Sequence, residues 1–204
     1  MYEVQDRGPR GFIPEKILEA LLVSTGIVAL AEMGDKTQLL ALVLAARYRR
    51  PLPVVLGILV ATLANHLLAA ALGAWITQAA GIEAMRWILG ASFLAMAAWA
   101  LIPDRLEKEE ASQVRLGVFG ATVVAFFLVE MGDKTQVATV ALAARYASIA
   151  AVVAGTTLGM LLANVPVVVL GERLLRRVPV KAVRRAAATV FAVLGALALV
   201  DPKF

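Results

Sequence analysis

Long apolar segments alternate with short polar ones along almost the whole chain. Six segments hold the run of about 20 apolar residues that a helix needs to cross a bilayer. They are Ile17–Ala46, Val54–Ala79, Met85–Ile102, Leu116–Ala144, Ile149–Leu170 and Ala182–Val200. The segments between them carry proline, glycine and charge, which end helices; Gly81-Ile82-Glu83, for example, separates the second segment from the third. The pattern therefore predicts six transmembrane helices.

Composition supports a membrane protein and excludes an ordinary soluble domain. Hydrophobic residues make up 61% of the 204 residues, charged residues 17%, and the mean hydropathy is +0.82. The sequence has no cysteine, which excludes disulfides and thiolate metal ligands. Despite a pI near 9.9, we expect no nucleic-acid partner, because the basic residues lie in short segments between apolar ones. The lipid bilayer is the expected partner.

The polar segments divide the chain into four parts. Residues 1–16 form a polar tail, 17–102 a first group of three helices, 103–115 a central loop, and 116–204 a second group of three helices. Of the twenty Lys and Arg residues, two lie in the middle of predicted helices, six flank the helices on one side and twelve on the other. Basic residues gather on the cytoplasmic side of a membrane. We therefore expect a multi-pass inner-membrane protein with both termini on the non-cytoplasmic side.

One heptapeptide occurs twice in the chain. Glu-Met-Gly-Asp-Lys-Thr-Gln occupies residues 32–38 and again residues 130–136, and we call these copies the first and the second acidic box. At the same offset of 98 residues, Leu44–Tyr48 is identical to Leu142–Tyr146. Each half holds three predicted helices, an odd number, so the second half must enter the membrane in the opposite sense. The predicted fold class is all-α integral membrane, with six transmembrane helices as two inverted-topology three-helix repeats.

Both acidic boxes lie at the middle of their apolar segments. A charged side chain at the centre of a bilayer costs roughly 2.5–3.5 kcal/mol, so an ionisable residue there indicates a function. The predicted helices around the boxes are longer than the hydrocarbon core, and Gly34 and Gly132 are natural positions for a break or a close helix contact. The midplane between inverted repeats is where transporters of this design bind substrate.

The boxes offer the ligands of a hard divalent cation. Four carboxylates are the candidate metal ligands: Glu32, Asp35, Glu130 and Asp133. In a continuous helix, the Glu and Asp of one box share a face, and the Lys at i+4 reaches the Glu. Lys36 and Lys134 compensate part of the charge, which leaves about two negative charges for one divalent cation or two protons to neutralise. Oxygen ligands suit Ca²⁺, Mg²⁺ or Mn²⁺ and disfavour copper and zinc.

Metal release and proton uptake are coupled in such a site. When the metal leaves, burial and mutual repulsion of the carboxylates favour their protonation. Further polar residues are candidates for auxiliary ion binding or a proton path: Thr37, Gln38, Asn65, Thr135, Gln136 and Asn164. For the two asparagines, an interhelical hydrogen bond is an equal alternative. His66, the only histidine, is a proton relay, a metal ligand or a packing residue.

Two Glu-x-Gly-Asp-Lys-Thr boxes on the first and fourth of six predicted helices resemble the signature of a cation-exchanger family. That family includes the human transmembrane protein 165 and its yeast, chloroplast and bacterial manganese-exporting relatives. Glu32–Thr37 and Glu130–Thr135 match the signature without departure, and the resemblance covers essentially the whole chain. It implies export of Mn²⁺ or Ca²⁺ from the cytosol in exchange for protons, with the box acids as one shared site and no resident cofactor. We expect Mn²⁺ to be the physiological substrate.

Three alternatives differ in mechanism. A cation channel with the same acids as its filter would show no proton coupling. An amino-acid exporter would have only the two lysines to bind a substrate carboxylate. A membrane-embedded phosphatase would need a nucleophile or an arginine clamp on phosphate, and no arginine is expected within the predicted helices, so we expect no enzyme. The sequence does not define an oligomeric state.

Overall fold

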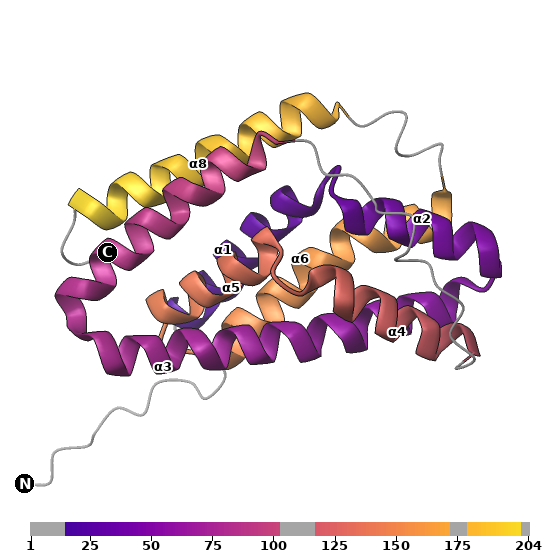
Figure 1. The fold of residues 1–204 in the computed structure, drawn as a ribbon, viewed down its shortest axis with the longest axis horizontal. Coiled ribbons are helices and arrows are strands. Elements are labelled where there is room, and N and C mark those ends of the chain that lie inside the picture. Colours follow the sequence, from indigo (N-terminus) through magenta and orange to yellow (C-terminus); the bar gives the residue numbers. More distant parts are fainter. Residues whose placement is uncertain (1–14, 103–116, 172–178, 201–204) are drawn as a thin grey trace, which may run out of the picture.

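The computed structural model describes residues 15–102, 117–171 and 179–200, which form helices and short connections (Figure 1). The helices are α1 (Glu15–Glu32), α2 (Lys36–Tyr48), α3 (Pro51–Ala100), α4 (Gly117–Glu130), α5 (Lys134–Arg145), α6 (Ile149–Leu170) and α8 (Val180–Val200). The predicted all-α class is confirmed for this part of the chain. The predicted tail up to residue 14, the central loop 103–115 and residues 201–204 lie outside the described residues.

Each acidic box interrupts a helix at its glycine. α1 ends and α2 begins within the first box, and α4 ends and α5 begins within the second. Gly34 and Gly132 both have a φ of 79°, in the left-handed region that residues with a Cβ rarely adopt. The axes of α1 and α2 differ in direction by 73°. The prediction of a break at each box glycine is confirmed.

One predicted helix boundary was wrong. The sequence placed a break at Gly81-Ile82-Glu83, but α3 is continuous from Pro51 to Ala100. A single glycine costs a helix only about 1 kcal/mol relative to alanine, and no proline stands there to remove a backbone hydrogen bond. The second and third apolar segments therefore belong to one helix, whose two parts run in different directions (Figure 1).

Several of the described helices meet the length and hydropathy of a membrane span. Pro51–Ala80, Ile149–Leu170 and Lys181–Val200 are long and apolar enough to cross a bilayer, and α1 with α2 adds a fourth span if the bent pair is counted as one. Ala84–Ala100 and Gly117–Glu130 are apolar but shorter. The described residues thus contain three or four candidate spans, and the count of six stays a prediction.

Two glycines at equivalent positions of the halves bring helices into backbone contact. A Cβ added at Gly155 in α6 would lie 2.5 Å from the carbonyl oxygen of Leu21 in α1. A Cβ added at Gly57 in α3 would lie 2.6 Å from the Thr122 side chain and 3.0 Å from the carbonyl oxygen of Phe119, both in α4. The two contacts are equivalent in the repeat, because Gly155 lies 98 residues after Gly57 and Phe119 lies 98 residues after Leu21. Small residues of this kind let helices approach closely within a bilayer.

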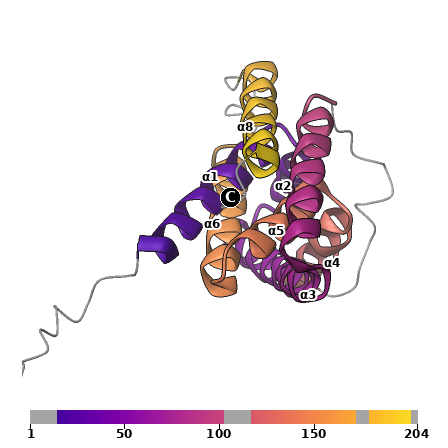
Figure 2. The same ribbon diagram turned by 90° about the vertical axis from the view of Figure 1, so that its left-hand side faces the viewer.

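α8 and the second part of α3 form a layer on one side of the other helices (Figure 2). Phe93 of α3 and Phe191 of α8, which are also 98 residues apart, stack with their ring centroids 6.4 Å apart. Gly90 of α3 faces the Leu199 side chain, and Gly195 of α8 faces Leu94, so the two helices lie close together. α8 also contacts α1, which brings its first turns near the first acidic box.

Candidate metal-binding site

The two acidic boxes come together in the interior of the helix bundle. Glu32 and Glu130 have no exposed surface, and Asp35 and Asp133 are each 1% exposed. Four carboxylates that are 98 residues apart in pairs thus share one buried region. Such burial is costly for ions unless they are paired, protonated or bound to a metal.

The broken turn of each box has the same construction. The Gly34 N–H donates to Gln38 Oε1 at 2.8 Å, and the Gly132 N–H donates to Gln136 Oε1 at 2.7 Å. Asp35 and Asp133 occupy the N-cap positions of α2 and α5, both with extended backbone. The side-chain oxygens of the two glutamines, which were candidates for auxiliary ion binding, therefore accept hydrogen bonds from the broken turns. The aspartates lie where the partial positive charge of a helix N-terminus favours a carboxylate.

Three carboxylates form the tightest group of possible ligands. One oxygen from each of Glu32, Asp35 and Asp133 lies within 4.8 Å of the other two. Glu130 is not part of this group. Glu32 Oε1, Glu130 Oε1 and Asp133 Oδ2 are buried and have no hydrogen-bond partner among the described residues. Such oxygens retain the lone pairs that a cation or a proton needs.

A threonine in each box orients the glutamate. The Thr37 hydroxyl donates to Glu32 Oε2, and the Thr135 hydroxyl donates to Glu130 Oε2 at 2.9 Å. Each of these glutamates therefore has one oxygen held by a threonine and one oxygen without a partner among the described residues. This arrangement fixes the carboxylate plane and aims its second oxygen.

The lysines form ion pairs between the boxes, not within one. Lys134 Nζ pairs with Asp35 Oδ1, and Lys36 Nζ lies 3.5 Å from Asp133 Oδ1. The i+4 spacing that would let the Lys reach the Glu of its own box requires a continuous helix, and the glycine interrupts the helix between the two residues. Compensation of negative charge, the role expected for the lysines, agrees with the two observed pairs.

Both box glutamines, together with Asn65, link the boxes to neighbouring helices. Gln38 Nε2 donates to the carbonyl oxygen of Ala163 in α6 at 2.8 Å, and Gln136 Nε2 lies 3.5 Å from Asn65 Oδ1 in α3. Asn65 Nδ2 also donates to the Phe127 carbonyl oxygen at 3.1 Å. Ala163 and Asn65 are 98 residues apart, so each box glutamine reaches the same position of the other half.

Two further candidates are fully buried. Asn164 Nδ2 donates to the Met160 carbonyl oxygen at 3.0 Å within α6, while its Oδ1 has no partner among the described residues. His66 has no exposed surface, and neither ring nitrogen has a hydrogen-bond partner in the described part of the chain. No described contact joins either side chain to the box acids, so their roles stay open.

An arginine that sequence reasoning left out also reaches the site. Arg184 in the second turn of α8 donates from its Nη2 to the carbonyl oxygen of Gly34 at 3.1 Å. The expectation that no arginine lies within the helices was wrong, because α3 includes Arg86 and α8 includes Arg184. The repeat carried a signal, since Arg184 is 98 residues after Arg86.

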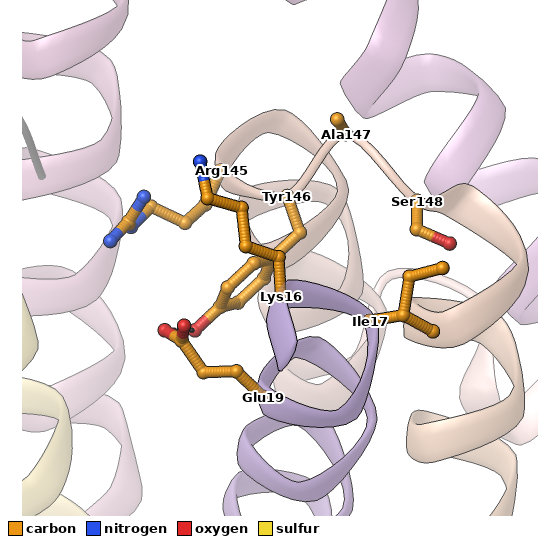
Figure 3. A pocket seen from close by; sticks show the side chains of 7 residues that line it. All are labelled: Lys16, Ile17, Glu19, Arg145, Tyr146, Ala147 and Ser148. Atoms are coloured by element: carbon orange, nitrogen blue, oxygen red, sulfur yellow. Dashed lines mark hydrogen bonds between the residues drawn. The ribbon is translucent and has the colours of Figure 1, made fainter. Parts of the chain in front are cut away.

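A cavity lies where the start of α1 meets the end of α5 (Figure 3). It has a volume of about 360 Å³, and Lys16, Glu19, Arg145, Tyr146 and Ser148 line it. The Tyr146 hydroxyl donates to Glu19 Oε1 at 3.1 Å, and Figure 3 shows the two side chains pointing toward each other. Burial and the nearby Glu19 carboxylate raise the pKa of Tyr146 to about 12, so the phenol stays protonated.

The two ends of the bundle are packed differently at equivalent positions. A Cβ added at Gly73 of α3 would lie 2.3 Å from the carbonyl oxygen of Val140, so α3 and α5 touch there. The equivalent residue Gly171, at the end of α6, instead borders a cavity of about 420 Å³ that Leu42 and Ala45 of α2 also line. The two halves are therefore not exact copies in their present conformation.

Comparison with known proteins identifies the kind of protein. The family model described as divalent cation/proton antiporter GDT1 matches residues 20–108 and 118–204. A protein of Vibrio cholerae serotype O1 named "Putative manganese exporter" is 50% identical over 178 residues, which cover 87% of this chain and 88% of the relative. No solved structure matches the chain.

Proposed function

The chain belongs to the GDT1 family of divalent cation/proton antiporters, and from this membership we propose that it exports Mn²⁺ from the cytoplasm in exchange for protons. The family is one of membrane transporters, not of enzymes. Ca²⁺ is the second candidate substrate. The observation that carries the proposal is the buried group of Glu32, Asp35 and Asp133, whose oxygens lie within 4.8 Å of one another.

The donor set supports Mn²⁺ or Ca²⁺ as the cargo. Both are hard cations that bind carboxylate oxygens. The three carboxylates of the group place one such oxygen each within 4.8 Å of the other two. Glu130 adds a fourth buried carboxylate, with one oxygen held by Thr135 and the other without a partner in the part of the chain that the structure describes. In the proposed site, Glu32, Asp35 and Asp133 bind the ion directly, and Glu130 completes the charge.

Charge balance supports exchange for protons. Four carboxylates against Lys36 and Lys134 leave about two negative charges, which one divalent cation neutralises. A site that releases the ion into a low-dielectric region must take up other positive charge, and protons on the carboxylates are the available form. Metal and protons then compete for the same oxygens, which is the condition for obligatory exchange.

Reciprocal contacts support two inverted repeats around the site. Lys134 pairs with Asp35 while Lys36 lies near Asp133, and such an exchange of partners is the mark of a two-fold relation. Tyr146, just after α5, binds Glu19, near the start of α1, so these two helices run in opposite directions. An in-plane two-fold axis through the boxes accounts for both observations.

The unequal packing of the two ends supports alternating access. At Gly73, α3 and α5 are in contact, while at the equivalent Gly171, at the other end of the bundle, a cavity lies between α2 and α6. We assign the second end to the cytoplasm from the distribution of basic residues. Rocking of the halves would close the cytoplasmic end and open the other, so that the ion site faces each side in turn.

The test is metal uptake into inside-out proteoliposomes that contain the purified protein and a pH dye. We expect saturable Mn²⁺ entry with proton exit, weaker Ca²⁺ entry, and loss of both fluxes in Glu32→Gln. Glu15→Gln is the matched control, because Glu15 is an exposed acid at the start of the same helix. Mn²⁺ entry without proton movement would favour a channel, and the absence of flux with either ion would refute the proposal.

A further inference from the structure

The Gly34 carbonyl group lies outside the hydrogen-bond pattern of the two helices that flank it. α1 ends at Glu32 and α2 begins at Lys36, so the peptide between Gly34 and Asp35 belongs to the broken turn. Arg184 of α8 donates to this carbonyl oxygen at 3.1 Å, and its side chain is half-buried. A guanidinium is a rigid donor with a permanent charge, and it therefore holds an acceptor firmly.

This contact holds the backbone that carries a box carboxylate. The Gly34 carbonyl and the Asp35 N–H belong to one planar peptide unit, so a bond to the first fixes the second. The Asp35 N–H donates to the Glu32 carbonyl oxygen at 3.0 Å, and the Gly34 N–H donates to Gln38 at 2.8 Å. Arg184 thus completes a set of three bonds that hold both peptide planes next to Gly34, the residue with the greatest backbone freedom.

We propose that Arg184 is a positioning residue of the ion site, which acts through the Gly34 carbonyl on Asp35 and Glu32. This inference rests on the proposed function, and it gives α8 a part in the ion site. Arg184 comes from α8, which contributes no carboxylate to the site, so the position of α8 sets the geometry of the first box. Its positive charge also opposes a bound cation, and the two effects on affinity have opposite signs. The positioning effect is larger than the charge repulsion, so loss of Arg184 weakens Mn²⁺ binding.

The experiment compares Arg184→Ala and Arg184→Lys with the matched control Arg185→Ala. Arg185 is the next residue on the same helix and is exposed. Two quantities are measured: the Kd of Mn²⁺ for the detergent-purified protein, from the electron paramagnetic resonance signal of free Mn²⁺, and the KM and maximal rate of proteoliposome uptake. Each maximal rate is normalised to the number of Mn²⁺ sites found by titration, so that loss of folded protein does not lower the apparent maximal rate per site.

We expect Arg184→Ala to raise the Kd and the KM about three- to tenfold, which is the scale of the net contribution of one hydrogen bond. Arg184→Lys should fall between the wild type and Arg184→Ala, because an ammonium group keeps the charge but is a less rigid donor. Arg185→Ala should stay within about twofold of the wild type. If Arg184→Ala does not fold, an unchanged Kd and KM in Arg184→Lys alone would overturn the proposal.

Two other results would also overturn it. A Kd for Arg184→Ala equal to that of Arg185→Ala would mean that the contact does not position the site. A lower Kd would mean that charge repulsion is the larger effect. Failure of the proposed function is distinguishable from both, because in that case the wild-type protein itself would neither bind nor exchange Mn²⁺.

Discussion

Lys134 pairs with Asp35, a residue from the other half of the chain. The reciprocal pair, Lys36 with Asp133, is longer at 3.5 Å, and its lysine side chain is 22% exposed compared with 4% for Lys134. The same sequence motif therefore gives two ion pairs of different burial. Loss of one partner should cost most where the remaining charge is least accessible to water.

We expect Lys134→Gln to destabilise the protein by about 3 kcal/mol and Lys36→Gln by about 1 kcal/mol or less. The measurement is the unfolding free energy, or the thermal midpoint, in one detergent at one pH. Adding Asp35→Asn to Lys134→Gln should recover most of the lost stability, because the carboxylate that paired with Lys134 is then replaced by a neutral amide. Equal losses in the two single variants would contradict the difference in burial.

Glu32 and Glu130 should contribute unequally to ion binding although they are equivalent in the repeat. Glu32 belongs to the group of three carboxylates and Glu130 does not. We expect Glu32→Gln to weaken Mn²⁺ binding about 100-fold and Glu130→Gln about tenfold, on the scale known for ligands and their supporting residues. Titration of the purified variants with Mn²⁺ measures both values. Identical Kd values would mean that all four carboxylates bind the ion alike.

Gly155 should be essential for the packing of α6 on α1. Its Cβ would lie 2.5 Å from a backbone carbonyl oxygen, which has no freedom to move aside. We expect Gly155→Ala to destabilise the protein by about 1–3 kcal/mol. Gly26→Ala is the control in α1, since a Cβ there meets nothing within 4 Å, and it should stabilise by about 0.5–1 kcal/mol. A thermal midpoint for Gly155→Ala at or above that of the wild type would refute the close contact.

A substitution at Gly132 measures the energetic cost of the left-handed backbone conformation without a steric clash. It has a φ of 79°, yet a Cβ at this position would meet nothing within 4 Å. We expect Gly132→Ala to lose about 1–2 kcal/mol of stability, and Gly132→Asn to lose less, because asparagine tolerates the left-handed region better. Unfolding of the two variants beside the wild type tests this order. Equal stability of all three would mean that the turn does not need the left-handed conformation.

The sequence predicted which residues meet but not how they pair. Identical boxes at matched depth were sufficient to expect four carboxylates within the membrane, and the glycines Gly34 and Gly132 were recognisable as positions for either a break or a close helix contact, because charge and glycine have strong local consequences in a bilayer. The ion pairs between the boxes were not predictable in this way. They depend on the break itself, which turns Lys36 and Lys134 away from the i+4 geometry of an intact helix.

Other features depended on long-range packing. Gly81 looked like a helix end, but one glycine is a weak signal when the neighbouring turns pack against other helices, and α3 continues through it. Arg184 looked like one of many basic residues of a cytoplasmic segment. Its contact with Gly34 spans 150 residues of sequence, and only the fold brings α8 beside the first box.

The pairing of Asp35 with Lys134 also has a consequence for biogenesis. A ribosome makes Asp35 before it makes Lys134, which is 99 residues later in the chain. During that interval the first half must stay in the membrane or its insertion machinery without the lysine that pairs with Asp35 in the folded protein. We therefore expect α1 and α2 to remain near water or near the insertion machinery until α4 and α5 arrive, and the order of synthesis to decide when the first half becomes stable in lipid.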